Sequence, residues 1–169
     1  MHMRWMDFLA VEAVRPNLRA HDGESLLAEL SELLAPGADV PREMLAGALC
    51  ARERLGTTAM EGGVAIPHCR VEGVRRIVTC VGLHRGGLAF GEPEDGLVRI
   101  FVGVVAPPDT AGLHLNVLSR IAALLHAPPL RDALLATLTA SEAHALLARA
   151  ETALHPHPVE PPRRASLRG

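Results

Sequence analysis

Three short apolar runs in the middle of the chain constrain the fold more than any other feature of the sequence. They lie at residues 64–66, 77–83 and 98–105, and glycine-rich segments separate them. Runs of this length, rich in valine and isoleucine, are typical of buried strands. Helical patterns precede and follow them, so the predicted order is α-α-β-β-β-α-α-α. This order indicates an α/β layer architecture, in which helices flank a sheet.

Apolar residues at helical spacing mark the segments on either side of the strands. The first helix opens at Asp22 and is expected to stop at Pro36, and the second starts near Pro41, a residue that suits a first turn. Further on, Asp109 or Thr110 is a candidate N-cap. The expected helices span about 22–35, 41–55, 113–125, 129–138 and 140–150.

Length and composition fit one domain with a tail. Of the 169 residues, 49% are hydrophobic, which is enough to bury a sizeable core. Proline, arginine and histidine dominate the last part of the chain, as in Pro161-Pro-Arg-Arg. We therefore expect a domain at residues 1–152 and a disordered tail at residues 153–169.

Charge and aromatic content argue against several classes of function. Aromatic residues make up only 2% of the chain, whereas RNA-binding surfaces usually stack bases on exposed rings. The formal net charge of -2 gives no strong attraction to nucleic acid or to a membrane surface. The sequence contains no lysine, which excludes a Schiff base or a Walker A loop.

The cysteines and the apolar segments predict a cytoplasmic protein. Cys50, Cys69 and Cys80 are odd in number and show no C-x-x-C spacing, which suits a reducing compartment. The N-terminal region lacks the long apolar stretch of a signal peptide. No apolar stretch approaches the roughly 18 residues that span a bilayer, so we expect no membrane insertion.

The segment from Arg52 to Arg70 carries the strongest chemical signal. An apolar strand ends in Ile66 and Pro67, and His68 follows, so that the histidine is expected just past a strand end on a stiffened backbone. Binding sites in α/β proteins tend to form at strand ends. A neutral imidazole there is a competent nucleophile at neutral pH.

Residues near His68 in the sequence suit a phosphoryl group. Arg52, Arg54 and Arg70 carry guanidinium groups that match phosphate geometry, and Gly62-Gly63 could let backbone amides approach the oxygens. Phosphoryl transfer asks for such donors and for an in-line nucleophile. From the residues alone, an ordinary strand-end histidine bonded to the backbone remains the alternative.

The same segment resembles a known family signature. Residues Arg52 to His68 read R-E-R-L-G-T-T-A-M-E-G-G-V-A-I-P-H, and this stretch is similar to the region around the phosphorylated histidine of type-2 enzyme IIA domains of the bacterial phosphotransferase system, the fructose/mannitol family. The similarity is greatest to the stand-alone nitrogen-regulatory subgroup, and the helix order matches over about residues 8–150. The resemblance implies a single α/β domain with a mixed β-sheet that has helices on both faces.

The resemblance also implies roles for three residues. The phosphoryl acceptor falls on His68, and the arginine that stabilises the phosphohistidine falls on Arg52. A second family histidine, which opens a helix, falls on His114, where it would orient His68 or bind a phosphoryl oxygen. On the residues alone, His114 shares a helical stripe with Leu118 and could simply be a packed histidine. Where the family usually has a small residue after the Pro-His, this chain has Cys69, which raises the question of a redox role.

The implied function is that of a histidine phosphocarrier. The phosphoryl donor would be an HPr-type histidine phosphocarrier, and the downstream partner a IIB domain or a regulatory target protein. No separate cofactor is expected. The output is expected to be regulatory, although a IIA component of a separately encoded fructose/mannitol-type sugar permease remains an alternative. The sequence names neither the sugar nor the target.

Two further alternatives belong to other classes of function. One is a regulatory binding module that has this fold but is not phosphorylated, against which the presence of Arg52, His68 and His114 together argues. The other is a metal site made of His68, Cys69 and His114. Neighbours in an extended chain point in opposite directions, so joint ligation by residues 68 and 69 would be awkward, and we expect no metal.

Overall fold

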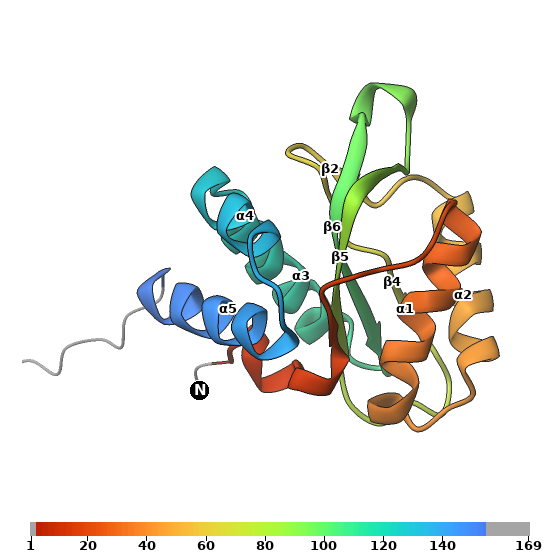
Figure 1. Ribbon diagram of the computed structural model, residues 1–169. Coiled ribbons are helices and arrows are strands. Elements are labelled where there is room, and N and C mark those ends of the chain that lie inside the picture. The colour runs from red at the N-terminus through yellow and green to blue at the C-terminus, as the bar shows by residue number, and fades with distance from the viewer. Residues whose placement is uncertain (1–2, 155–169) are drawn as a thin grey trace, which may run out of the picture.

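The computed structural model describes residues 3–154, which form a mixed sheet between two layers of helices (Figure 1). The strand order is β1-β5-β6-β3-β2, and β4 also pairs with β6. Parallel pairs join β1 to β5 and both β3 and β4 to β6, whereas β5–β6 and β2–β3 are antiparallel. The strands are β1 Val14–Arg15, β2 Ala59–Met60, β3 Val64–Ala65, β4 His68–Arg70, β5 Val78–Ala89 and β6 Leu97–Ala106.

Helices cover both faces of the sheet, as the resemblance implied. α1 and α2 lie on one side of it, and α3, α4 and α5 lie on the other (Figure 1). The α-helices are α1 Gly23–Ala38, α2 Arg42–Arg54, α3 Ala111–Leu125, α4 Pro128–Leu135 and α5 Ala140–Leu154. Short 3-10 helices are η1 Trp5–Phe8, η2 Val11–Ala13 and η3 Pro93–Asp95. The predicted fold class is confirmed.

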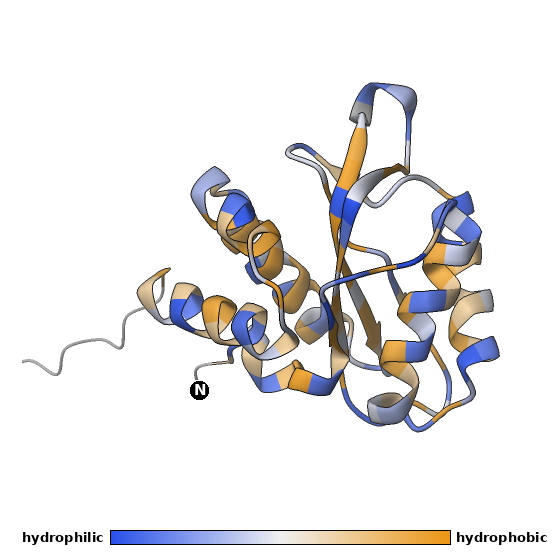
Figure 2. Ribbon diagram, viewed as in Figure 1, coloured by the Kyte–Doolittle hydropathy of each residue, from blue (hydrophilic) through white to orange (hydrophobic). Residues whose placement is uncertain are grey.

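The core lies between the sheet and the apolar stripes of the helices (Figure 2). Leu26, Leu30 and Leu34 of α1 are fully buried. A Cβ atom at Gly103 of β6 would lie 2.7 Å from Cys80 Sγ and 3.2 Å from Leu34 Cδ1. The absence of a side chain at residue 103 therefore lets α1 pack close to the middle of the sheet.

Sequence patterns located the helices better than the strands. Helix α1 continues through Pro36, the expected stop, and ends at Ala38; the residue that caps it, Asp39, has a left-handed φ of 54°. Pro36 removes one helical hydrogen bond, because it has no N–H, and the helix ends two residues later at Ala38. Strand β5 extends past Leu83 to Ala89, and the short strands β1, β2 and β4 were not predicted. These three strands span two or three residues each, too few for a periodic signal.

Two further predictions concern the C-terminal tail and membrane insertion. Helix α5 runs to Leu154, and the rest of the predicted disordered tail lies outside the described residues. Within residues 3–154, none of the helices combines the length and the apolar character needed to cross a bilayer.

Candidate functional site

His68 is held where the chain re-enters the sheet. After β3 the carbonyl of Pro67 accepts a 2.9 Å hydrogen bond from the N–H of Val104, and His68 is then the first residue of β4, opposite Val104. His68 therefore lies inside a second short strand, not just past a strand end as expected. Pro67 is tolerated between the two strands because the bond to β6 uses its carbonyl and not the amide hydrogen that proline lacks.

One ring nitrogen of His68 is bonded to the backbone. Nδ1 lies 2.8 Å from the carbonyl oxygen of Ile66. Since a carbonyl oxygen only accepts, Nδ1 carries the hydrogen and Nε2 keeps its lone pair. Nε2 makes no hydrogen bond within the described part of the chain. His68 is therefore bonded to the backbone, as the simpler alternative from the sequence stated. The same bond leaves Nε2 available as a nucleophile, so the two interpretations are compatible.

The surroundings of His68 favour its neutral form. Partial burial lowers the pKa of the imidazole, and the Arg52 guanidinium lowers it further, while the bond to Ile66 and the Glu53 carboxylate oppose this shift. A neutral imidazole at neutral pH has the lone pair that nucleophilic attack requires.

His114 lies against His68. The centroids of the two rings are 5.5 Å apart, with the ring planes at 73°. His114 is buried, with 6% of its surface exposed, and its Nε2 atom has no hydrogen-bond partner among the described residues. Burial, together with the neighbouring His68 and Arg70, lowers its pKa to about 4, so His114 is neutral at neutral pH. A packed and satisfied histidine would not leave a buried nitrogen unpaired.

Arg52 completes a pocket from a third element. It lies in the last turn of α2, and its guanidinium NH1 donates a 2.9 Å hydrogen bond to the carbonyl of Gly56. Arg52, His68 and His114 line one open pocket of about 670 Å³. The structure therefore brings together the three residues that the resemblance singled out. A guanidinium next to two imidazoles can bind the oxygens of a phosphoryl group.

Arg70, one of the three arginines that the sequence indicated as suited to a phosphoryl group, joins the same pocket. It is exposed and lines the pocket together with His68 and His114. Residues 68 and 70 of an extended strand share one face, so this alternation was the signal that could have indicated the position of Arg70. Arg54 does not line this pocket: it lines a separate cavity, with Cys50 and Phe90.

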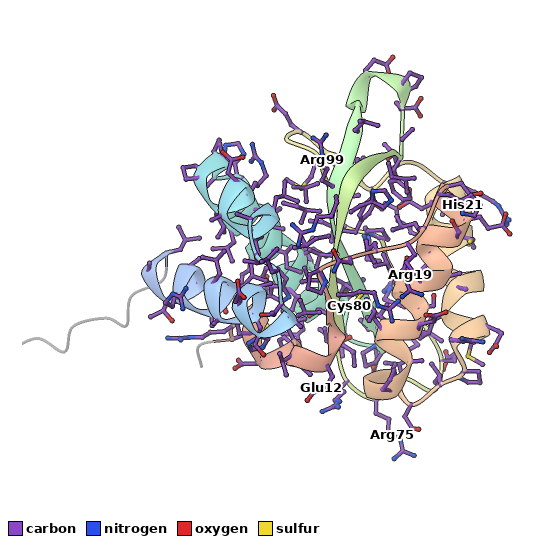
Figure 3. All side chains as sticks on the ribbon, in the orientation of Figure 1. Glu12, Arg19, His21, Arg75, Cys80 and Arg99 are labelled. Atoms are coloured by element: carbon purple, nitrogen blue, oxygen red, sulfur yellow. The ribbon has the colours of Figure 1, made fainter. Side chains whose placement is uncertain are left out.

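Gly62 and Gly63 lie away from the pocket, contrary to the expectation that their amides approach a phosphoryl group. Both have positive φ angles, 94° and 76°, and they form the turn between β2 and β3. The carbonyl of Gly63 accepts from the N–H of Arg99, near the start of β6 (Figure 3). His68 pairs with Val104, five residues further along β6, or about 16 Å at the usual rise of a strand.

The cysteine beside His68 is a protonated thiol. Cys69 is buried, and burial raises its pKa to about 12. Redox sensors and metal sites use the thiolate, which this environment disfavours. Cys80 lies in the interior of the sheet and has its pKa raised to about 12 for the same reason (Figure 3). Residues 3–154 contain no group of three or more His, Cys, Asp or Glu side chains placed to bind a metal ion.

Comparison with known proteins connects this geometry to a family. A profile of the enzyme IIA type 2 component of the phosphoenolpyruvate-dependent sugar phosphotransferase system matches residues 7–150. A nitrogen regulatory protein of Bradyrhizobium diazoefficiens is 32% identical over 143 residues, which cover 84% of this chain and 93% of the relative.

Solved structures show the same fold. The nitrogen regulatory protein IIA-Ntr of Neisseria meningitidis superposes with a TM-score of 0.79 at 27% identity, covering 84% of this chain and 97% of the other. The enzyme IIAMtl of Escherichia coli, in a complex with phosphorylated enzyme IIBMtl, gives a TM-score of 0.71 at 25% identity, covering 83% and 96%. The extent of these matches, over nearly all of residues 7–150, shows that the chain belongs to the type-2 enzyme IIA family of the phosphotransferase system.

Proposed function

We propose that this protein is a histidine phosphocarrier that accepts a phosphoryl group on Nε2 of His68 from an HPr-type protein. The observation that carries the proposal is the bond from Nδ1 of His68 to the Ile66 carbonyl, which leaves Nε2 as the nucleophile in a pocket with Arg52 and His114. Membership in the enzyme IIA family supports it, because the family name describes a component of a phosphoryl-transfer system.

The transfer step needs no net proton movement. The lone pair of His68 Nε2 attacks the phosphorus of the donor's phosphohistidine, and a new N–P bond forms as the donor's N–P bond breaks. The donor ring carries a hydrogen on its other nitrogen, so when the electron pair of the broken bond returns to the donor nitrogen, a neutral imidazole leaves. The phosphorylated His68 ring keeps its hydrogen on Nδ1 and carries the positive charge that the donor ring had. Arg52 and Arg70 would bind the charged oxygens, which is the main contribution that a protein makes to such a step.

His114 would bind a phosphoryl oxygen after transfer. Its Nε2 atom is buried and unpaired, so a donated bond from Nε2–H would satisfy an atom that otherwise has no partner. The phosphoryl group would also raise the pKa of His114 from its low value, because a nearby negative charge favours the protonated ring.

The rim of the pocket suits a protein donor. Leu55 is 85% exposed and Leu115 is 63% exposed, and both line the pocket that contains His68. Exposed apolar side chains around a reactive group are typical of a surface that docks another protein. The E. coli relative in complex with phosphorylated enzyme IIBMtl supports a IIB domain as the downstream partner, and a regulatory target protein is the alternative.

The output that the comparisons favour is regulatory. The relative from B. diazoefficiens and the N. meningitidis structure are both nitrogen regulatory proteins, and the first is 32% identical over most of both chains. The likeness to enzyme IIAMtl supports the second candidate, a IIA component of a sugar permease. Either function would place the protein in the cytoplasm, where the donor resides.

A reconstituted relay tests the proposal. Phosphoenolpyruvate, enzyme I and an HPr-type carrier are mixed with the parent protein or with His68→Ala, and intact mass is measured at neutral to alkaline pH, where phosphohistidine survives. We expect one added phosphoryl group in the parent and none in the variant. No added mass with several competent donors would instead favour the unphosphorylated regulatory module.

A further inference from the structure

Two adjacent charged residues at the end of α2 bind opposite ends of the same turn. Arg52 donates to the carbonyl of Gly56, while the Glu53 carboxylate accepts from both the N–H of Thr58, at 3.2 Å, and the Thr58 hydroxyl. Residues 55–58 are thus bound from both sides by the last turn of one helix.

The contact between Glu53 and Thr58 continues to the reactive histidine. The carbonyl of Thr58 accepts a 3.1 Å hydrogen bond from the N–H of Ile66. The carbonyl of Ile66 in turn accepts from Nδ1 of His68, at 2.8 Å. Three successive hydrogen bonds therefore connect the Glu53 carboxylate with the imidazole, through two residues of the backbone.

We propose that Glu53 is a positioning residue for His68: through Thr58 and Ile66 it fixes the carbonyl that holds the hydrogen on Nδ1 and leaves Nε2 as the reacting nitrogen. This inference rests on the proposed phosphocarrier function, and it assigns Glu53 no contact with the phosphoryl group.

The position of Glu53 in its helix supports a role of this kind. An acidic side chain in the last turn of a helix lies close to the negative end of the helix dipole, which disfavours it by a few tenths of a kcal/mol. The two bonds from Thr58 offset that cost, since they are charge-assisted and partly buried. If this position served only the stability of α2, a positive or neutral side chain would stabilise the helix better than a carboxylate.

The charge of Glu53 also reaches the imidazole. The carboxylate raises the pKa of His68, against the lowering by burial and by Arg52. Its removal should therefore lower the pKa of His68 further and loosen the preference for the Nδ1–H tautomer.

Glu53→Gln is the central variant of the test, because Gln keeps the size but loses the charge and one acceptor oxygen. Thr58→Val removes the hydroxyl donor, and Thr58→Ser restores it. Glu61→Gln is the matched control, because it changes the net charge by the same amount as Glu53→Gln. The Glu61 side chain is exposed and makes no hydrogen bond among the described residues.

Two readouts are measured on each folded variant. Nitrogen-15 NMR of the histidine ring gives the tautomer and the pKa of His68 without any donor. Phosphoramidate, a small phosphoryl donor, gives the reactivity of His68 without protein docking. The melting temperature of each variant separates loss of fold from loss of reactivity.

We expect Glu53→Gln to shift the His68 tautomer toward Nε2–H, to lower its pKa, and to slow phosphorylation roughly tenfold, as loss of orientation does elsewhere. Thr58→Val should move the same readouts less, and Thr58→Ser and Glu61→Gln should match the parent. The inference would be overturned if Glu53→Gln kept the parental tautomer, pKa and phosphorylation rate. It would also be overturned if the loss of reactivity in this variant were fully explained by the fraction of protein that is unfolded.

The two proposals fail in different ways. If Glu53→Gln does not fold, Thr58→Val decides the inference through the same tautomer and rate. If no HPr-type protein phosphorylates the parent, the phosphocarrier proposal fails, yet the NMR readouts still decide whether Glu53 positions the ring.

Discussion

At the level of single residues, the pocket depends on keeping two neighbouring histidines neutral. Burial lowers the pKa of both His68 and His114, and each ring also lies close to a guanidinium, from Arg52 and Arg70 respectively. A neutral His68 keeps its nucleophilic lone pair, and a neutral His114 avoids a buried charge without a counter-ion. The arriving phosphoryl group would supply that counter-ion.

Arg52→Ala should slow phosphorylation of His68 by the order of 10²-fold, because one donor to the charged oxygens is lost. It should also shorten the lifetime of the phosphohistidine. The measurement is the rate of mass gain and of its loss after the donor is removed. Arg54→Ala is the matched control, since Arg54 lies in the same helical turn and lines a different cavity. Equal rates in the two variants would mean that Arg52 does not bind the phosphoryl group.

His114 makes the stability of the protein depend on pH. Its pKa is about 4 when folded, against about 6.5 for a free histidine, so between about pH 6.5 and about pH 4 the unfolded chain takes up this proton and the folded chain does not. The free energy of unfolding should therefore fall by about 2 kcal/mol from this residue between about pH 7 and about pH 5. Denaturant titrations followed by the fluorescence of Trp5, the only tryptophan, measure it. Over the same change in pH, the free energy of unfolding of His114→Gln should fall less than that of the parent. An equal fall in the two proteins would contradict the burial of a neutral His114.

At this scale the sequence predicted some of the site and missed the rest. The segment from Arg52 to His68 is contiguous, so its resemblance to the family was sufficient to single out these two residues. His114 came from a second motif far along the chain. The hydrogen bonds that Thr58 donates to Glu53 and that Ile66 donates to Thr58 depend on how β2 and β3 pair, and a two-residue strand gives no sequence signal for that pairing.

At the level of elements, a buried carboxylate joins the two ends of the described chain. Glu151 of α5 is 3% exposed and accepts hydrogen bonds from the backbone N–H groups of Trp5 and Met6, at 2.8 and 3.1 Å. Arg120 of α3 lies 3.4 Å from the same carboxylate. The helical layer of α3 and α5 is thereby joined to the N-terminal segment.

Glu151→Ala should destabilise the protein by roughly 2–4 kcal/mol, because two amides and a partly buried guanidinium lose their acceptor. Denaturant titration at neutral pH measures the loss, and phosphorylation of the folded fraction should remain at the parental rate. Glu142→Ala, which removes an exposed capping residue at the start of α5, is the comparison and should cost less. A similar cost in both variants would contradict the role assigned to Glu151.

Helices could be predicted because their signals are long and local. The helices expected at about residues 129–138 and 140–150 correspond to α4 and α5. Paired prolines begin α4, and Thr139 and Glu142 cap α5. The cap of α3 differs: Thr110 is at the N-cap, but its hydroxyl donates to the carbonyl of Pro107 and does not accept from the helix. The N–H of Thr110 also donates to the carbonyl of Pro107, so a local turn at residues 107–110 takes up the side chain.

At the level of the whole molecule, the pocket exists because three elements from distant parts of the chain meet at one end of β6. α2 contributes Arg52, β4 contributes His68, and α3, which follows β6, contributes His114. The two helices belong to opposite layers of the sheet (Figure 1). The pocket is open and has exposed leucines at its rim, which would let the proposed protein donor approach.

The most direct test of the account is the site of phosphorylation, down to the atom. Nitrogen-15 NMR of the ring nitrogens in the phosphorylated protein, with phosphorus coupling, identifies both the histidine and the nitrogen. The account predicts a phosphoryl group on Nε2 of His68, with the hydrogen retained on Nδ1 and the bond to Ile66 intact. A phosphoryl group on Nδ1 of His68, or on any other histidine, would contradict it.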